Sequence, residues 1–374
     1  MNLEFFTMPI HPLGRGWRET LKEDQEAFFL ADELGFSEGY VGEHVTDEAE
    51  NITSCVVFLA TLADRVKRMR LGTGTVNLPN SHPAHIAGQI AMLDHLLEGR
   101  LNFGISPGGL LSDAEIFGNL DADRNAMFVE GIDAVLALWT KDAPYDIVGK
   151  YRNISTRRQH VPSIGQGIVA KPLQRPHPPI VVTAVAPFSK GVTAAAARGW
   201  DPISANFLMP KWVATHKDAN ADGCRQGGRE VDFGNWRVAK SIFVAEDRRV
   251  AEHYARGPGS PYVHYFSSLF TKLVKNGRSN LFKEDPSMPD DKLTLDHVLD
   301  RLVIFGTPDE VADKILAFRD EVGPFGTLLY AGHDWRDVML AKTSMRLMAE
   351  RVIPMVNAAI GTAPVLKIAR PTRG

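Results

Sequence analysis

The chain has 374 residues, of which 44% are hydrophobic and 23% are charged. This is enough apolar material for a sizeable core, which excludes a disordered or fibrous protein. The formal net charge of −3 offers no basic field for nucleic acid or for an anionic membrane surface. We therefore expect a small molecule as the partner.

The cysteines Cys55 and Cys224 stand alone, without CxxC spacing or a disulfide framework. No segment reaches the roughly 18 apolar residues that a membrane span requires, and the opening residues MNLEFFTMPI lack the features of a signal peptide. These features predict a cytoplasmic protein that binds neither nucleic acid nor membrane.

Short apolar strands alternate with longer amphipathic helices along the chain. The predicted strands, in chain order, are 3–10, 38–44, 69–79, 101–109, 179–185, 201–207, 235–247 and 326–332. The predicted helices, in the same order, are 21–35, 52–66, 82–100, 124–139, 190–199, 306–322 and 339–356. In the helix at 306–322, Thr307 is the expected N-cap and Pro308 lies in the first turn.

This alternation predicts parallel strands joined by helical crossovers, and the eight strands favour an α/β protein with a (β/α)8 TIM barrel. An open doubly wound sheet is the lesser option. Irregular segments at about 140–178 and 256–300 are expected as insertions after strands 4 and 7. We expect one domain over residues 1–361 and a loosely ordered C-terminal tail over 362–374.

Reactive residues of a parallel barrel lie at the carboxyl ends of its strands. The second strand ends on Glu43 and His44, two ionisable groups side by side. Either His44 is a buried histidine with an ordinary hydrogen-bond partner, or it lies at the rim of a reactive pocket. The other strand ends contribute a polar, glycine-rich set: His11, Gly74 to Asn77, Ser106 to Gly109, Thr183 to Ala186, Ser204 to Asn206, His333 and Asp334.

Several kinds of site find no support in the sequence. There is no HExxH, and His82 and His85 lack an obvious third ligand, so we predict no catalytic metal. No GxSxG turn suggests a hydrolase, since Ser106 is followed by a proline. Neither GxxxxGK[ST] nor a strand-linked GxGxxG is present, which argues against a nucleoside triphosphate and against a Rossmann dinucleotide site.

An anion site is better supported. Ser189, Lys190 and Gly191 stand where the fifth strand gives way to a helix of small residues, so a hydroxyl, a cation and free backbone N–H groups converge there. Arg124, which opens the helix after the fourth strand, could add a guanidinium. Ordinary helix capping is an equally good interpretation of Ser189 taken alone.

The run GTGTVNLPNSHP places Gly72 and Gly74 inside a strand. Glycine there marks a bulge or a point where another group approaches the backbone closely, and a flat ring is one such group. The alternative is a strand weakened near a bend of the barrel.

Taken together, these residues resemble the bacterial luciferase-like superfamily of flavin-dependent monooxygenases over about residues 1–358. The motifs that carry the resemblance are GYVGEH, RLGTGTVNLPNSHP with AMLDHLLEGRLNFGISPGG, DRNAM, SKGVTAAAARG and GTPDEVADKI. Within the superfamily, ENITS and GTLLYAGHDW resemble the branch of limonene and diketocamphane monooxygenases.

The resemblance implies roles for individual residues. His44 matches the histidine beside the flavin that assists the oxygen chemistry, with Glu43 as a group that fixes its tautomer. Gly74 and Thr75 match a non-proline cis peptide behind the flavin ring. Ser189, Lys190 and Gly191, with Arg124, match the phosphate end of FMN. Further contacts to the flavin are expected by position from Asn77, Thr183 and Asn206, and from Ser106, where this sequence departs from luciferase.

The implied reaction uses reduced FMN, supplied by a separate flavin reductase, and O2 to oxygenate a small apolar or cyclic, terpene-like substrate. The aromatic segment 256–290 is interpreted as a lid over the substrate, with core packing under a long loop as the alternative. A homodimer is expected, through the early helices. Two other hypotheses remain open: a deazaflavin-dependent hydride-transfer enzyme and a non-catalytic flavin-binding protein.

Overall fold

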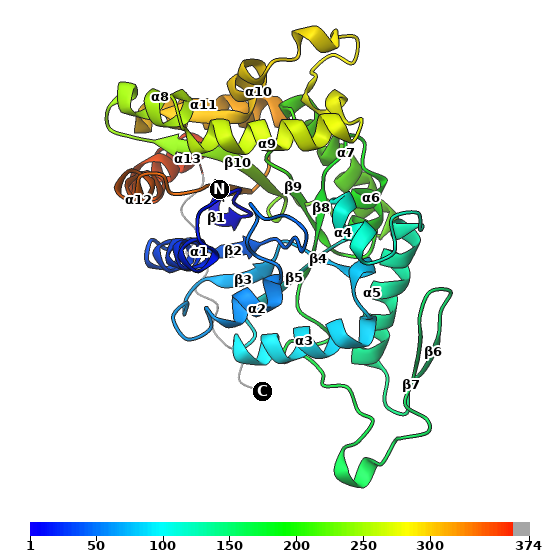
Figure 1. Ribbon diagram of the computed structural model, residues 1–374. Helices are drawn as coiled ribbons and strands as arrows, with labels where there is room; N and C mark the ends of the chain where they lie inside the picture. Colours follow the sequence, from blue (N-terminus) through cyan, green and yellow to red (C-terminus); the bar gives the residue numbers. More distant parts are fainter. Residues whose placement is uncertain (362–374) are drawn as a thin grey trace.

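The computed structural model describes residues 1–361, and the predicted tail at 362–374 lies outside the described residues. A closed barrel of parallel strands forms its centre (Figure 1). Its strands are β1 (Asn2–Thr7), β2 (Glu38–Val41), β3 (Arg70–Thr73), β5 (Leu101–Ser106), β8 (Ile180–Ala184), β9 (Asp201–Ser204), β10 (Arg237–Val244) and β12 (Thr327–Gly332). β12 pairs with both β1 and β10, which closes the ring, so the predicted TIM barrel is confirmed.

Helices surround the barrel, as the alternating pattern predicts (Figure 1). They are α1 (Trp17–Glu33), α2 (Cys55–Ala60), α3 (Pro83–Leu96), α5 (Arg124–Thr140), α6 (Lys190–Ala197), α7 (Pro210–Gln226), α11 (Pro308–Val322), α12 (Val338–Leu347), the π-helix η5 (Met348–Val352) and α13 (Ile353–Ala359). Thr307 caps α11 in a reciprocal capping box with Glu310, which confirms the predicted cap. None of the described helices has the length and apolar character needed to cross a membrane.

The third predicted strand is divided in the structure. β3 ends at Thr73, and a separate two-residue strand, β4 (Val76–Asn77), pairs with β5. The short helices η1 (Leu78–Asn80) and α4 (Leu111–Ile116) follow β4 and β5. Both lie close to the carboxyl ends of their strands, where a barrel site is expected.

Two long segments leave the barrel. The first, between α5 and β8, carries the antiparallel hairpin β6 (Asp146–Val148) and β7 (Asn153–Ser155) with η2 (Pro162–Ile164), and it projects from the body of the protein at the lower right of Figure 1. The second lies between β10 and β12, and its residues 256–300, which were expected to be irregular, are mostly helical. It contains α8 (Arg248–Arg256), α9 (Pro261–Lys275), η3 (Ser279–Phe282), η4 (Asp290–Lys292), α10 (Leu295–Leu302) and the strand β11 (Val303–Gly306), which pairs with β10.

A charged network fills the interior near the amino ends of the strands. Arg237 donates to Glu4 at 3.1 Å and to Glu38 at 2.8 Å. Tyr40 donates to the same Glu38 carboxylate at 2.5 Å. All of these groups are largely shielded from solvent, and a buried charge is tolerated only when paired in this way. The network fills the interior at this end of the barrel with paired side chains.

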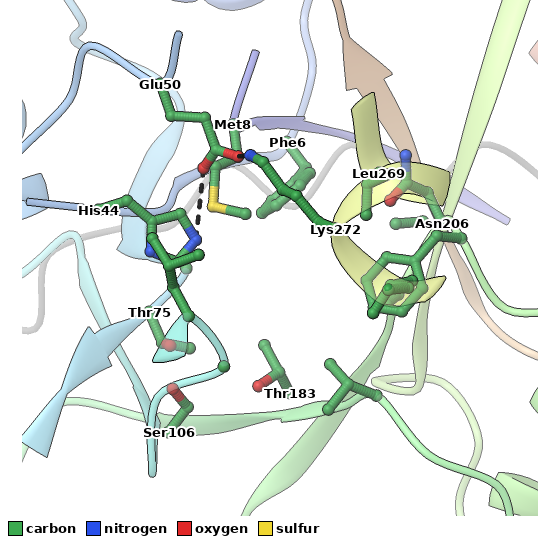
Figure 2. A pocket seen from close by; sticks show the side chains of 18 of the residues that line it. Phe6, Met8, His44, Glu50, Thr75, Ser106, Thr183, Asn206, Leu269 and Lys272 are labelled. Atoms are coloured by element: carbon green, nitrogen blue, oxygen red, sulfur yellow. Dashed lines mark hydrogen bonds and ion pairs between the residues drawn. The ribbon is translucent and has the colours of Figure 1, made fainter. Parts of the chain in front are cut away.

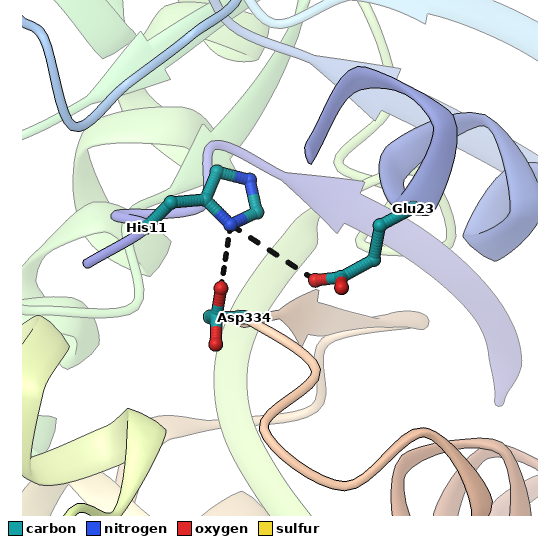
Figure 3. A group of neighbouring side chains, drawn as sticks. All are labelled: His11, Glu23 and Asp334. Carbon is teal, nitrogen blue, oxygen red and sulfur yellow. Dashed lines mark hydrogen bonds and ion pairs between the residues drawn. The ribbon is translucent and has the colours of Figure 1, made fainter. Parts of the chain in front are cut away.

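A second ionic group joins the loops that follow β1 and β12 (Figure 3). His11 lies 2.7 Å from Asp334 and 3.4 Å from Asp24, and Arg15 donates to Asp334 at 2.5 Å. Burial opposes a charge on His11, but its hydrogen bonds to Asp24 and Asp334 outweigh this and raise its pKa to about 9. A protonated His11 therefore ties the first strand of the barrel to the last.

This network predicts a pH-dependent contribution to stability. Because the pKa of His11 rises from 6.5 to about 9 on folding, its contribution is fully present below pH 6.5 and is lost as the pH rises toward 9. The free energy of unfolding of the wild type minus that of His11→Gln should fall by on the order of 3 kcal/mol across this range. Urea titrations at several pH values measure it, and a difference independent of pH would contradict the assignment.

Candidate functional site

A pocket opens at the carboxyl ends of the barrel strands, and α9 lies beside it (Figure 2). The empty space within and above it is about 1110 Å³, which includes open solvent. The wall combines apolar side chains with a few polar and charged groups, as ligand sites commonly do. The apolar part of the wall includes Phe6, Met8, Leu110, Val185, Ile203, Phe207, Leu269 and Leu273.

Most of the residues predicted from the sequence meet in this pocket. Its wall includes Glu43, His44, Gly74, Thr75, Asn77, Ser106, Thr183 and Asn206. The remaining predicted residues, Arg124, Ser189, Lys190 and Gly191, do not line the cavity. They lie at the start of α5 and at the start of α6.

His44 is held between two carboxylates. Its Nδ1 lies 3.0 Å from Asp113 Oδ2, and its Nε2 lies 3.3 Å from Glu50 Oε2. Burial by itself lowers the pKa of His44, but the charge of Glu50 and the hydrogen bond and charge of Asp113 raise it above the ordinary value. Asp113 also accepts from the backbone N–H groups of Val45 and Thr46, which fixes its position. The arrangement favours a protonated imidazole.

Glu43 does not have the role expected of it. Its carboxylate accepts from the Cys55 backbone N–H at 3.1 Å and from the Asn77 backbone N–H at 3.2 Å. The group that orients Nδ1 of His44 is Asp113, so the sequence interpretation of Glu43 as the tautomer-fixing residue is corrected. Burial raises the pKa of Glu43. Its position joins the end of β2 to the start of α2 and to β4.

The hydroxyl of Ser106 is occupied within the protein. It donates to Asn77 Oδ1 at 2.8 Å and accepts from the Gly108 backbone N–H at 3.1 Å. Arg124 donates to the carbonyl of Gly108 at 3.1 Å, which places its guanidinium next to this loop. Ser106 therefore shapes the loop after β5, and Arg124 is the nearby cation.

The turn before α6 has the geometry of a capped helix. Ser189 accepts from the Val192 backbone N–H at 3.3 Å, as an N-cap does. Lys190 is the first residue of the helix, and the Cβ of a larger residue at Gly191 would lie 3.5 Å from Ser189 Oγ. Ser189 is therefore a helix N-cap. The Lys190 cation and the N-terminus of α6 lie directly next to it.

The two strand glycines serve different purposes. At Gly72, a Cβ would lie 2.3 Å from the ring of Tyr40, so this glycine makes room for a buried side chain and not for a ligand. Gly74 lines the pocket, and the peptide bond between Gly74 and Thr75 is cis, as the family resemblance implied. The expectation of a flat ring next to the backbone therefore applies only to Gly74.

Asn206 lines the pocket but is also part of an internal hydrogen-bond chain. Its amide nitrogen donates to Ser241 at 3.1 Å, and its amide oxygen accepts from Tyr265 at 3.2 Å. Ser241 in turn lies 3.0 Å from Nε2 of His333. Asn206 thus connects β9, β10 and α9. Its amide nitrogen and its amide oxygen both form hydrogen bonds within the protein.

Sequence reasoning missed four charged residues of the site, namely Glu50, Asp113, Lys272 and Arg278. Asp113 is on a short helix after β5, and Lys272 is on α9. Arg278 lines the pocket and donates to the Val185 carbonyl at 3.0 Å, and within residues 1–361 it forms no ion pair. Glu50 opens the ENITS motif but was not singled out there, and Asp113, Lys272 and Arg278 belong to none of the motifs above. The helical spacing of Tyr265, Leu269 and Lys272 could have identified the inner face of α9.

One group of described residues has metal-ligand spacing: His11, Glu23 and Asp334 (Figure 3). Arg15 donates to both carboxylates, at 3.0 Å to Glu23 and at 2.5 Å to Asp334. The Arg15 guanidinium therefore already neutralises these carboxylates, as a bound metal ion would do. We interpret the group as an ion-pair network that joins two loops.

Comparisons with known proteins identify the family of this chain. A family model described as luciferase-like monooxygenase matches residues 1–323. The 4-hydroxyprotoasukamycin monooxygenase of Streptomyces nodosus subsp. asukaensis is 32% identical over 363 residues, covering 95% of this chain and 92% of that protein. The limonene 1,2-monooxygenase of Rhodococcus erythropolis is 26% identical, with coverage of 95% and 87%.

Among solved structures, the oxygenating constituent of 3,6-diketocamphane monooxygenase from Pseudomonas putida, in complex with FMN, superimposes with a TM-score of 0.85. It is 24% identical and covers 95% of this chain and 98% of its own. The chain therefore belongs to the luciferase-like monooxygenase family, a family of oxidoreductases. Its resemblance to the limonene and diketocamphane branch is confirmed.

Proposed function

We propose that the protein is the oxygenase component of a two-component monooxygenase, which uses reduced FMN and O2 to oxygenate a small apolar or cyclic, terpene-like substrate. The observation that carries the proposal is His44, an imidazole held between carboxylates in a largely apolar pocket at the barrel mouth. Relatives named for limonene and diketocamphane support the substrate class.

The residues present fit FMN. Glu50 lines the pocket, and its buried Oε2 has no hydrogen bond within the described residues, so this acceptor is available to a ligand. Gly74, Thr75, Asn77, Ser106, Thr183 and Asn206 would form the walls around the flavin ring. Arg124, Ser189, Lys190 and Gly191 would hold its phosphate, since a guanidinium, an ammonium and a helix N-terminus favour an anion.

When bound, reduced FMN would supply the redox chemistry with O2. The chain's own contribution begins at His44. Because an ionised Asp113 only accepts hydrogen bonds, Nδ1 of His44 donates to it, and Nε2 is left as the atom that exchanges a proton on the side of Glu50. Phe6, Met8 and Leu269 line the same space with apolar surface, which would help to keep water away from reactive species.

A separate flavin reductase is proposed as the source of reduced FMN. The sequence has no strand-linked GxGxxG motif for a nicotinamide dinucleotide. A deazaflavin-dependent hydride transferase and a non-catalytic flavin-binding protein remain the alternatives, and the following two experiments separate them from the proposal.

The first experiment tests the cofactor. FMN should bind more tightly than riboflavin, which lacks the phosphate, and Arg124→Met or Lys190→Met should weaken FMN binding by about tenfold or more, because each removes a charge-assisted hydrogen bond. Riboflavin binding should not change in either variant. Flavin fluorescence titration measures both affinities, and equal binding of FMN and riboflavin by the wild type would contradict the assignment of the phosphate site.

The second experiment tests the reaction. Reduced FMN, labelled O2 and a panel of cyclic ketones and monoterpenes should give a product that carries one labelled oxygen atom. His44→Ala should lose at least about a hundredfold in product formation, as expected for removal of a proton-transfer group, while it retains FMN affinity. Mass spectrometry of the products and oxygen uptake measure this. Uptake no greater than that of free flavin, or reduction of a deazaflavin instead, would contradict the proposal.

A homodimer is also proposed, through the face formed by α2 and α3. Val57 and Met92 are 62% and 63% exposed on this face, next to a groove floored by the small residues Ala60, Ala84 and Gly88. The same patch therefore offers both protruding side chains and a hollow to receive them, which is what a two-fold symmetric interface requires.

Substitution of Met92 tests the dimer. The wild type should have twice the chain mass of 41.2 kDa in light scattering after size exclusion, and Met92→Glu should elute as a monomer because a carboxylate is not tolerated in an apolar interface. The matched control is Met339→Glu, since Met339 is 72% exposed on α12, away from this face. A monomeric wild type, or an unchanged Met92→Glu, would contradict the proposed interface.

A further inference from the structure

One face of α9 is turned toward the pocket. Tyr265, Leu269, Lys272, Leu273 and Asn276 all line the cavity, and their spacing places them along one side of the helix and its C-terminal end. Lys272 is the cationic member of this set. The next lysine along the chain, Lys275, is exposed and forms no ion pair within residues 1–361.

Lys272 reaches across the pocket to the loop that follows β2 (Figure 2). Its Nζ donates to Glu50 Oε1 at 2.8 Å and also to Asp47. The other oxygen of the same carboxylate, Glu50 Oε2, lies 3.3 Å from Nε2 of His44. One carboxylate therefore joins an ammonium group on α9 to the imidazole at the end of β2.

We propose that Lys272 is a positioning residue for His44: by binding Oε1 of Glu50, it keeps Oε2 of that carboxylate beside the imidazole while it fastens α9 over the pocket. The inference rests on the function proposed above, since His44 is the group that it serves. It gives α9 a part in the chemistry in addition to its part in covering the pocket.

Burial explains why this contact matters more than a surface ion pair. The Glu50 side chain is only 7% exposed, and Oε2 has no hydrogen bond that would hold it in place. Exposed ion pairs contribute little because water and salt screen them, whereas a buried carboxylate without a partner is strongly disfavoured. Without Lys272, Glu50 would keep only His44 as a partner, at 3.3 Å and without a hydrogen bond, and we expect the carboxylate to turn toward solvent.

The charged groups near His44 allow a sharp test. They are Glu43, Asp47 and Glu50 from the strand end and loop, Asp113 from α4, and Lys272 from α9. The Glu50 carboxylate raises the pKa of His44, whereas the Lys272 cation, acting through space, lowers it by a smaller amount. A Lys272 that acts only through space therefore predicts a higher His44 pKa when it is removed. A Lys272 that positions Glu50 predicts a lower one.

The experiment is an NMR titration of histidine-labelled full-length protein, with the His44 signal assigned by its loss in His44→Ala. In Lys272→Met, the His44 titration midpoint should move to lower pH, toward that of Glu50→Gln, and the double variant should match Glu50→Gln. Lys272→Arg, which keeps the charge and the hydrogen bonds, and the control Lys275→Met should titrate like the wild type. If Lys272→Met does not fold, Lys272→Gln is titrated by the same criteria.

A midpoint for Lys272→Met that rises, or that coincides with that of Lys275→Met, would overturn the inference, and so would an unchanged midpoint in Glu50→Gln. The titration needs neither flavin nor substrate. Its failure is thus distinguishable from failure of the proposed function, which would appear as absent FMN binding or absent oxygen transfer by the wild type.

Discussion

The site depends on an imidazole held between two carboxylates. His44 is at the end of β2, Asp113 is on α4 after β5, and Glu50 is in the loop that leads to α2. Desolvation alone would lower the pKa of this imidazole, and the two carboxylates raise it above its ordinary value. The position of α4, the course of the β2 loop and the docking of α9 through Lys272 all converge on this single side chain.

The two ends of the barrel treat buried charge in different ways. At the closed end, Arg237 bonds to Glu4 and Glu38, so the network is satisfied within the protein. At the open end, Glu50 keeps a buried oxygen without a hydrogen bond within residues 1–361. A fully satisfied network stabilises a fold, whereas an incompletely satisfied one next to a cavity is a place for a ligand. This difference supports the assignment of function to the open end.

The sequence predicted the barrel well because its buried strands are short apolar runs bounded by glycine and proline. It missed helices whose sequences lack a clear apolar stripe or are preceded by residues typical of a loop. The polar helix α7 carries few large apolar residues, and α9 begins with a Gly-Pro-Gly-Ser-Pro run that suggests a loop. Yet Ser260 and Pro261 are a helix N-cap and first-turn proline, and Tyr262, Phe266 and Leu273 follow at helical spacing, so the signal for α9 was present.

The site could be predicted only as far as strand ends indicate it. His44 was identifiable because it closely follows a strand, β2, but its partner was assigned wrongly to Glu43. Both residues lie beyond Val41, the last residue of β2, and Glu43 bonds the Cys55 and Asn77 backbone instead. The true partners, Asp113 and Glu50, reach His44 from other segments. The partners of a buried charge are the groups that the fold brings close to it, and a local sequence pattern does not identify them.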